Sequence, residues 1–310
     1  MTMCREDSAG TRTVSALSGD AALLDRLRTA TGQGRVHSVF TRVVNLLTPD
    51  GTLVTLAARD TGDAPRTLVV DLADWTGTPL AAGQPVTFAP GKLTLGTGPL
   101  HVTSTGAWPW RATPPSLAHL APGALARIAD RLDRLNQEFG PRGGMLGPVP
   151  GAGPLEQAVA RALDAGRTIL LTALRTGADD AEIRRGVLAL LGLGPGLTPA
   201  GDDFLTGLTF VAALPGAVPT GLVPTVRAVL AEHRGRTTDV SHATLTEAAD
   251  ARVRAELIDV LRQSADDGPP PRTPHDPVRR LLAIGHTSGS DTLSGLVAGL
   301  HLEEELRGSL

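Results

Sequence analysis

The pattern of hydrophobic and polar positions changes once along the chain, near residue 110. Before that point, short β-rich runs alternate with turn clusters such as Thr48-Pro-Asp-Gly. Short runs at fairly regular spacing are typical of a small sandwich or barrel. The predicted strands are residues 36–47, 52–58, 67–72, 85–88, 93–95 and 101–104. One short helix is expected before them, at residues 20–30.

After the change, apolar residues recur at helical spacing. The first such stripe consists of Leu125, Ile128, Ala129, Leu132, Leu135 and Phe139. Further helices are predicted at residues 155–165, 168–174, 180–191 and 222–233. The sequence therefore predicts an α+β protein in three parts. These are a disordered tail at residues 1–18, a β-rich N-terminal domain at 19–112 that forms a sandwich or barrel, and a mainly helical domain at 113–310.

The helical part carries a glycine-rich stretch, GLGPGLTPAGDDFL, at residues 192–205. By residue type, Thr198 is a candidate helix cap and Pro199 suits the first helical position. Asp202 and Asp203 then fall in the first helical turn. The stretch predicts a glycine-rich loop that leads into a helix.

A second stretch, GHTSGSDTLSGL at residues 285–296, repeats this order of residues. Ser288 and Asp291 have the spacing of a capping box where an apolar run begins. The repeated residues are Gly201, Asp203, Leu205, Gly207 and Leu208, which align with Gly289, Asp291, Leu293, Gly295 and Leu296. The chain thus builds a glycine-rich loop, followed by a helix with Asp in its first turn, twice.

The repeat has two interpretations. In a structural one, the acids complement the helix dipoles, and Gly207, Gly295 and Gly299 let two helices cross closely. In a functional one, both helix starts face one pocket that binds a small anionic substrate, with Thr287 and the loop glycines Gly194, Gly196, Gly201 and Gly289 as binding groups.

The charge of such a pocket can be counted. Two helix N-termini supply about half a positive charge each, against three carboxylates from Asp202, Asp203 and Asp291. A Mg²⁺ ion held by these carboxylates would neutralise the excess. Without a metal, loop N–H groups would hold the anion directly and the carboxylates would point away. The sequence leaves both arrangements open.

Other residues are candidates on chemical grounds. His286 has a side chain suited to stabilising a developing anion or moving a proton. Arg142, in a loop with several glycines, is a candidate for binding carboxylate or phosphate, with an exposed loop arginine as the alternative. Ser241 and His242 are candidates for a pocket wall, with Ser241 as a plain helix cap the alternative.

Composition excludes several classes. The chain has 310 residues, 41% hydrophobic and 20% charged, with a net charge of −3. The chain lacks a block of basic residues, which argues against nucleic acid as a partner. No apolar run is long enough for a membrane span, so a cytoplasmic protein is expected. The single cysteine excludes a disulfide framework, and the single lysine lacks a phosphate-loop context. No organic cofactor is predicted.

The two glycine-rich stretches together resemble the family of the AllH-type subunit of oxamate carbamoyltransferase. The resemblance implies a role in purine or allantoin catabolism and partner subunits in one enzyme. That enzyme moves a carbamoyl group between oxalurate and phosphate, giving oxamate and carbamoyl phosphate. The resemblance does not imply that this chain alone catalyses the transfer.

Carbamoyl transfer develops negative charge on the former carbonyl oxygen. His286 and a hydroxyl of Thr198 or Ser288 are suitable groups to stabilise that oxygen. Two alternatives remain. The acidic helix starts are also similar, more distantly, to the metal motifs of ADP-ribosylglycohydrolases, which implies a Mg²⁺-dependent hydrolase. A non-catalytic structural subunit is the other alternative.

Overall fold

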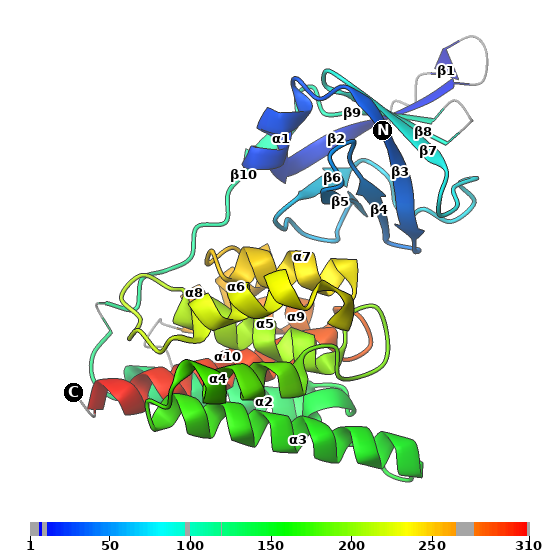
Figure 1. Ribbon diagram of the computed structural model, residues 1–310. Helices are drawn as coiled ribbons and strands as arrows, with labels where there is room; N and C mark the ends of the chain where they lie inside the picture. Colours follow the sequence, from blue (N-terminus) through cyan, green and yellow to red (C-terminus); the bar gives the residue numbers. More distant parts are fainter. Residues whose placement is uncertain (1–5, 8–10, 97–99, 119, 265–275, 309–310) are drawn as a thin grey trace. The chain divides into compact units, whose positions relative to one another are not determined.

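The computed structural model describes residues 6–7, 11–96, 100–118, 120–264 and 276–308 (Figure 1). The chain divides into two compact units, residues 1–112 and residues 113–310. The first unit is built from strands and the second from helices, so the α+β prediction is confirmed. Among the described residues, no helix has both the length and the apolar character needed to span a membrane.

The first unit is a closed mixed β-barrel of eight strands in the order β2-β6-β5-β4-β3-β7-β8-β9, closed by parallel pairing of β9 with β2. Its other parallel pair is β5 with β6. The strands are β2 (Thr11–Asp20), β3 (Gly32–Val39), β4 (Val43–Leu47), β5 (Leu53–Ala58), β6 (Thr67–Val70), β7 (Pro85–Ala89), β8 (Lys92–Leu95) and β9 (Leu100–Thr103). Helix α1 (Ala21–Leu27) follows β2. Two short strands, β1 (Glu6–Asp7) and β10 (Trp108–Trp110), also pair with β2.

Two sequence predictions in this unit are wrong. The predicted disordered tail at residues 1–18 contains most of β2, in which Val14 and Ala16 are buried in the barrel core. Local sequence did not reveal this strand, because its stability comes from pairing with β6 and β9. Residues 36–47 form not one strand but the hairpin of β3 and β4, which turns at residues 40–42.

The second unit is helical. Its α-helices are α2 (Ala124–Phe139), α3 (Pro154–Arg175), α4 (Asp180–Leu190), α5 (Ala200–Ala212), α6 (Leu222–Glu232), α7 (Asp239–Ala248), α8 (Ala255–Ser264), α9 (Asp276–Leu282) and α10 (Ser288–Gly308). Helix α3 is continuous where the sequence predicted two helices. Its Gly166 lies where a β-carbon would come 2.9 Å from Leu190 of α4, so this glycine serves helix packing.

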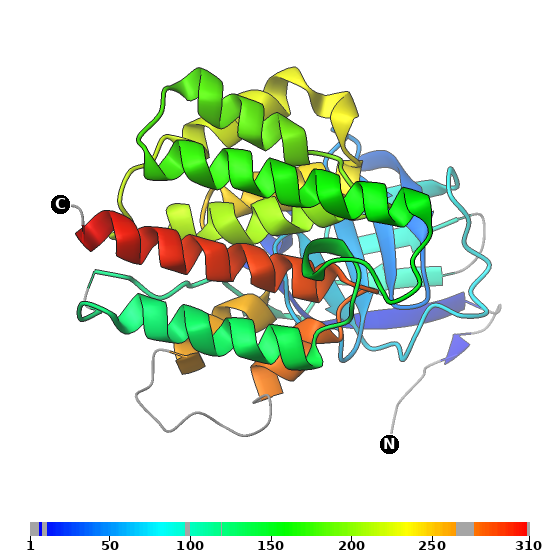
Figure 2. The same ribbon diagram turned by 90° about the horizontal axis from the view of Figure 1, so that it is seen from below.

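Helices α5 and α10 form the centre of this unit. Both views show them side by side, and Figure 2 shows α2 along the other side of α10. They cross at Gly207 and Gly295, where their backbones touch. A β-carbon at Gly207 would lie 2.1 Å from the Thr292 carbonyl oxygen, and one at Gly295 would lie 2.0 Å from the Phe204 carbonyl oxygen. The structural interpretation of these glycines is therefore confirmed.

The two crossing helices also correspond residue by residue. Gly207 approaches residues 292 and 296, while Gly295 approaches residues 204 and 208, which are the same positions in the other copy. The glycines at the helix starts agree as well, because Gly201 packs on the Leu190 carbonyl oxygen of α4 and Gly289 on the Leu281 carbonyl oxygen of α9. The sequence repeat is thus an approximate two-fold structural repeat of helix, loop and helix.

We expect Gly295→Ala to lower the free energy of unfolding by about 1–3 kcal/mol or more, because the methyl group of the alanine would overlap the backbone of α5. Chemical denaturation of the purified chain measures this change. The matched control is Gly308→Ala at the exposed end of the same helix, where a β-carbon would meet nothing within 4 Å. Equal stability of the two variants would contradict the close crossing.

Candidate functional site

The two repeated aspartates face each other because of the crossing. Asp203 and Asp291 each stand four residues before the crossing glycine, and residues four apart share a helix face. Both side chains are buried, with exposures of 7% for Asp203 and 0% for Asp291. The negative charge of Asp291 is one of the causes that raise the pKa of Asp203. The two helix starts therefore bring a pair of acids into one cluster.

Two hydroxyl groups complete this pair. The Thr198 and Ser288 hydroxyl oxygens lie 2.7 Å apart, and both groups hydrogen-bond to Asp203. The predicted caps are not formed. Pro199 occupies the N-cap position of α5, and Asp291 accepts a hydrogen bond from a distant loop instead of closing a capping box. Tertiary partners have taken the polar groups that the local pattern assigned to helix capping.

That loop, residues 140–147, reaches Asp291 through its backbone. The Met145 N–H donates to Asp291 Oδ1 at 2.7 Å, and the Thr287 hydroxyl also hydrogen-bonds to this carboxyl group. Gly144 has a φ of +51°, and a β-carbon there would lie 2.2 Å from Asp291 Oδ1. Sequence reasoning selected this loop for Arg142 and missed Met145, whose contribution is a backbone group with no residue signature.

Each acid keeps one oxygen without a partner. Asp203 Oδ2 and Asp291 Oδ2 are buried and have no hydrogen-bond partner. Burial is the largest cause that raises the pKa of both, well above the ordinary value for Asp203 and to about 6 for Asp291. The hydrogen bonds from Ser288 and Thr198 act in the opposite direction on the pKa of Asp203. The cluster therefore offers two buried acceptors to a ligand or a cation.

Asp202 has a different environment. It accepts hydrogen bonds from the Gly192 N–H at 2.7 Å and from the Thr237 hydroxyl, and it is 1% exposed. Burial raises the pKa of Asp202, while these hydrogen bonds lower it. Within the described ranges, no group of three or more His, Cys, Asp or Glu side chains is arranged to hold a metal ion. The magnesium prediction thus rests on Asp203 and Asp291 with neighbouring hydroxyls.

The glycines predicted to bind substrate fall into two groups. Gly194 and Gly196, with φ values of +123° and +99°, shape the first loop. Gly201 and Gly289 pack against helix ends, and their N–H groups donate to the carbonyl oxygens of Leu193 and Ile284. The N–H groups of Gly201 and Gly289 therefore already donate hydrogen bonds within the fold.

The remaining predicted residues lie around the cluster or away from it. His286 is exposed in the turn before α10, and Arg142 is exposed with its guanidinium donating to the Leu146 carbonyl oxygen at 3.3 Å. His242 lies 3.3 Å from the Leu230 carbonyl oxygen of α6. Ser241 is buried, and its hydroxyl group, which lowers the pKa of nearby Asp202, has no hydrogen-bond partner. Its interpretation as a helix cap is wrong, because Thr238 caps α7 by accepting from the Ser241 N–H.

Sequence reasoning also missed Asn136, which is 1% exposed on α2. Its amide nitrogen donates to the Ser290 carbonyl oxygen at 3.1 Å, and its oxygen accepts from the Ser290 hydroxyl at 2.9 Å. The available signal was a polar residue next to the apolar stripe of α2. The predicted stripe member Phe139 is instead 41% exposed, because it lies at the helix end.

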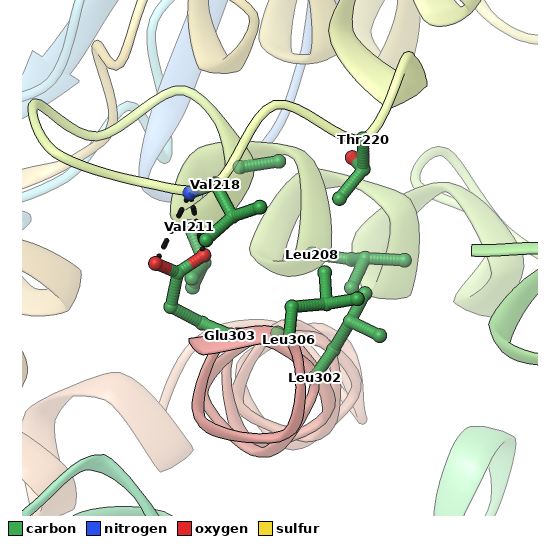
Figure 3. Close-up of a pocket in the computed structure, with 9 residues that line it drawn as sticks. Leu208, Val211, Val218, Thr220, Leu302, Glu303 and Leu306 are labelled. Carbon is green, nitrogen blue, oxygen red and sulfur yellow. Dashed lines mark hydrogen bonds between the residues drawn. The ribbon is translucent and has the colours of Figure 1, made fainter. Parts of the chain in front are cut away.

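A separate, small pocket lies between the later parts of α5 and α10 (Figure 3). Leu208, Val211, Leu302 and Leu306 line it. Both carboxylate oxygens of Glu303, which also lines it, accept from the Val218 N–H, and Glu303 pairs with Arg307. This pocket is mainly apolar and its carboxylate is satisfied, so the Asp203–Asp291 cluster is the stronger candidate site.

These observations define a class: a two-domain α+β protein with a mixed β-barrel and a helical domain whose paired helix starts enclose two buried acids. Two family models match the chain. One, described as oxamate carbamoyltransferase subunit AllH, matches residues 190–300, and the other, the AllH family N-terminal domain, matches residues 15–109. No solved structure matches the chain. The chain belongs to the AllH family of oxamate carbamoyltransferase subunits.

The raised pKa of Asp291 predicts a pH-dependent stability. Its value of about 6 in the folded chain exceeds the ordinary 3.8, so the folded chain binds this proton more tightly than the unfolded chain does. Stability therefore falls as pH rises from about 4 to about 6 and then stays low. Asp291→Asn removes this loss, with an expected gain of up to about 3 kcal/mol at pH 8 and roughly half of that at pH 5.

Denaturant unfolding of wild type and variant at both pH values measures the gain. The exposed Asp164, which pairs with Arg167 on α3, provides the control Asp164→Asn, with an expected change below about 1 kcal/mol at either pH. A gain in Asp291→Asn that does not grow with pH would contradict the raised pKa.

Proposed function

We propose that the cluster of Thr198, Asp203, Ser288 and Asp291 binds the carbamoyl-bearing substrate of the oxamate carbamoyltransferase to which this subunit belongs. The observation that supports this most directly is the pair of unpartnered carboxylate oxygens on buried Asp203 and Asp291. Buried polar groups are almost always hydrogen-bonded, so two such oxygens in one cluster indicate a missing partner. A ligand with N–H donors would supply that partner.

A carbamoyl group has the complementary chemistry. Its NH₂ group carries two donors, which suit the free oxygens of Asp203 and Asp291. Its carbonyl oxygen is an acceptor, which suits the hydroxyl groups of Thr198 and Ser288. In transfer from oxalurate to phosphate, a phosphate oxygen forms a C–O bond to the carbamoyl carbon, and negative charge develops on the carbonyl oxygen. The C–N bond to the oxamate nitrogen then breaks, and oxamate leaves after its nitrogen takes up the proton that the phosphate loses. Hydroxyl donors and helix N-termini placed near this oxygen would stabilise the developing charge.

In this proposal the two acids lie beside an anionic substrate, so the repulsion between like charges has to be reduced. The raised pKa of Asp203 keeps this group neutral more readily than an ordinary carboxyl group, which reduces repulsion. Magnesium is the alternative compensation, since Mg²⁺ binds one or two carboxylates and bridges them to phosphate. We favour the proton, because Asp202 is engaged by Gly192 and Thr237 and contributes no third carboxylate. His286 and Arg142, both exposed, are proposed to contact the phosphate or carboxylate end of the ligand.

Ligand binding by the purified chain tests the proposal. Carbamoyl phosphate or oxamate at about a hundred times its dissociation constant is expected to add about 2.7 kcal/mol of stability, measured as a thermal shift without Mg²⁺. The double variant Thr198→Val, Ser288→Ala is expected to bind at least tenfold more weakly in calorimetry, because two hydroxyl donors are lost. Thr168→Val on α3, whose exposed hydroxyl bonds to its own helix, is the matched control.

Each alternative predicts a different result. Binding that requires Mg²⁺ would assign the compensation to the metal and overturn the proton assignment. A shift with ADP-ribose instead of carbamoyl phosphate would favour a hydrolase. No shift of the wild type with any of these ligands would overturn the proposed site in this chain and favour a structural subunit.

A further inference from the structure

The segment before α7 is tied to the first glycine-rich loop at several points. Three consecutive side chains of this segment donate to the loop or to the helices on either side of it. Arg236 donates to the Leu188 carbonyl oxygen of α4 at 3.0 Å, Thr237 to the Asp202 carboxylate of α5, and Thr238 to the Leu197 carbonyl oxygen of the loop at 2.6 Å. The backbones are also in close contact, since a β-carbon at Gly192 would lie 1.9 Å from the Arg236 carbonyl oxygen. The loop that carries Thr198 is thus held by residues about 40 positions later in the chain.

Asp202 is the centre of these contacts. One of its carboxylate oxygens accepts from the Gly192 N–H and the other from the Thr237 hydroxyl. It therefore joins the beginning of the loop, the start of α5 and the segment before α7. Because Asp202 and Asp203 are adjacent in one helix, their side chains point about 100° apart, and holding the first orients the second.

We propose that Asp202 and Thr237 are positioning residues that hold Thr198 and Asp203 in the geometry of the ligand site. Thr238 supports the same loop, because it bonds to the carbonyl group immediately before Thr198. The inference rests on the proposed function for the identity of the ligand, whereas the hydrogen bonds themselves are independent of it. Neither Asp202 nor Thr237 contacts the ligand in this assignment.

The second copy of the repeat contains an equivalent anchor. Ser290 stands immediately before Asp291, as Asp202 stands before Asp203, and it exchanges hydrogen bonds with buried Asn136 on α2. Each copy therefore has one acid directed into the cluster and one preceding residue bonded to a neighbouring segment. This correspondence distinguishes a repeated positioning device from a single incidental hydrogen bond.

The variant Thr237→Val tests the proposal, because it removes the hydroxyl group while keeping a branched side chain. We expect faster amide hydrogen exchange at Gly192 and an affinity for carbamoyl phosphate that is at least tenfold weaker. Thr237→Ser, which restores the hydroxyl group, is expected to restore both properties. The matched control is Thr244→Val on α7, where the exposed threonine bonds to the Val240 carbonyl oxygen of its own helix.

The outcomes separate the two proposals. Weaker binding with faster exchange, both reversed by serine, supports the positioning role. Unchanged exchange at Gly192, or faster exchange with unchanged affinity, overturns it. If wild type binds no ligand, the proposed function fails, and the exchange measurement alone then decides whether Thr237 holds the loop. Should Thr237→Val not fold, the smaller Thr237→Ala, which also removes the hydroxyl group that bonds to Asp202, replaces it with the same expected results.

Discussion

The close crossing of α5 and α10 is the constraint on which the rest of the helical unit depends. At Gly207 and Gly295 each backbone occupies the space that a side chain of the other would need. The two helix starts lie on the same side of the crossing, one turn from the contact, because the Thr198 and Ser288 hydroxyl oxygens beside them are 2.7 Å apart. The acids at positions 203 and 291 then face one another without any further arrangement. A backbone contact between two glycines thereby produces a polar cluster.

The electrostatics of this cluster follow from the same geometry. Two helix N-termini bring partial positive charge together, and an acid in each first turn offsets it. Burial raises the pKa of both Asp203 and Asp291, which means that their charged forms are unfavourable in the fold despite the nearby helix N-termini. The hydroxyls of Thr198 and Ser288 reduce the penalty at Asp203 but leave one oxygen of each acid unpartnered.

The sequence predicted the repeat, the helix starts and the α+β fold class, because these depend on local periodicity and residue type. It treated close helix crossing and a shared site as alternatives, whereas the crossing is what brings the acids together. It also grouped Asp202 with Asp203 by adjacency, although the helix directs them to different neighbours. Met145, Asn136 and strand β2 were missed because their roles depend on partners distant in the chain, which no local pattern encodes.

The difference between neighbouring positions is the strongest argument that the acid pair serves binding. Asp202 and Ser290 occupy equivalent positions, and each hydrogen-bonds to a neighbouring segment. Asp203 and Asp291 occupy the next positions, and each leaves a buried oxygen unpartnered. Packing alone would be served better at those positions by a residue that is neutral or fully bonded. An unfavourable feature that occurs in both copies, at the positions where the copies meet, is explained when a ligand supplies the missing partners.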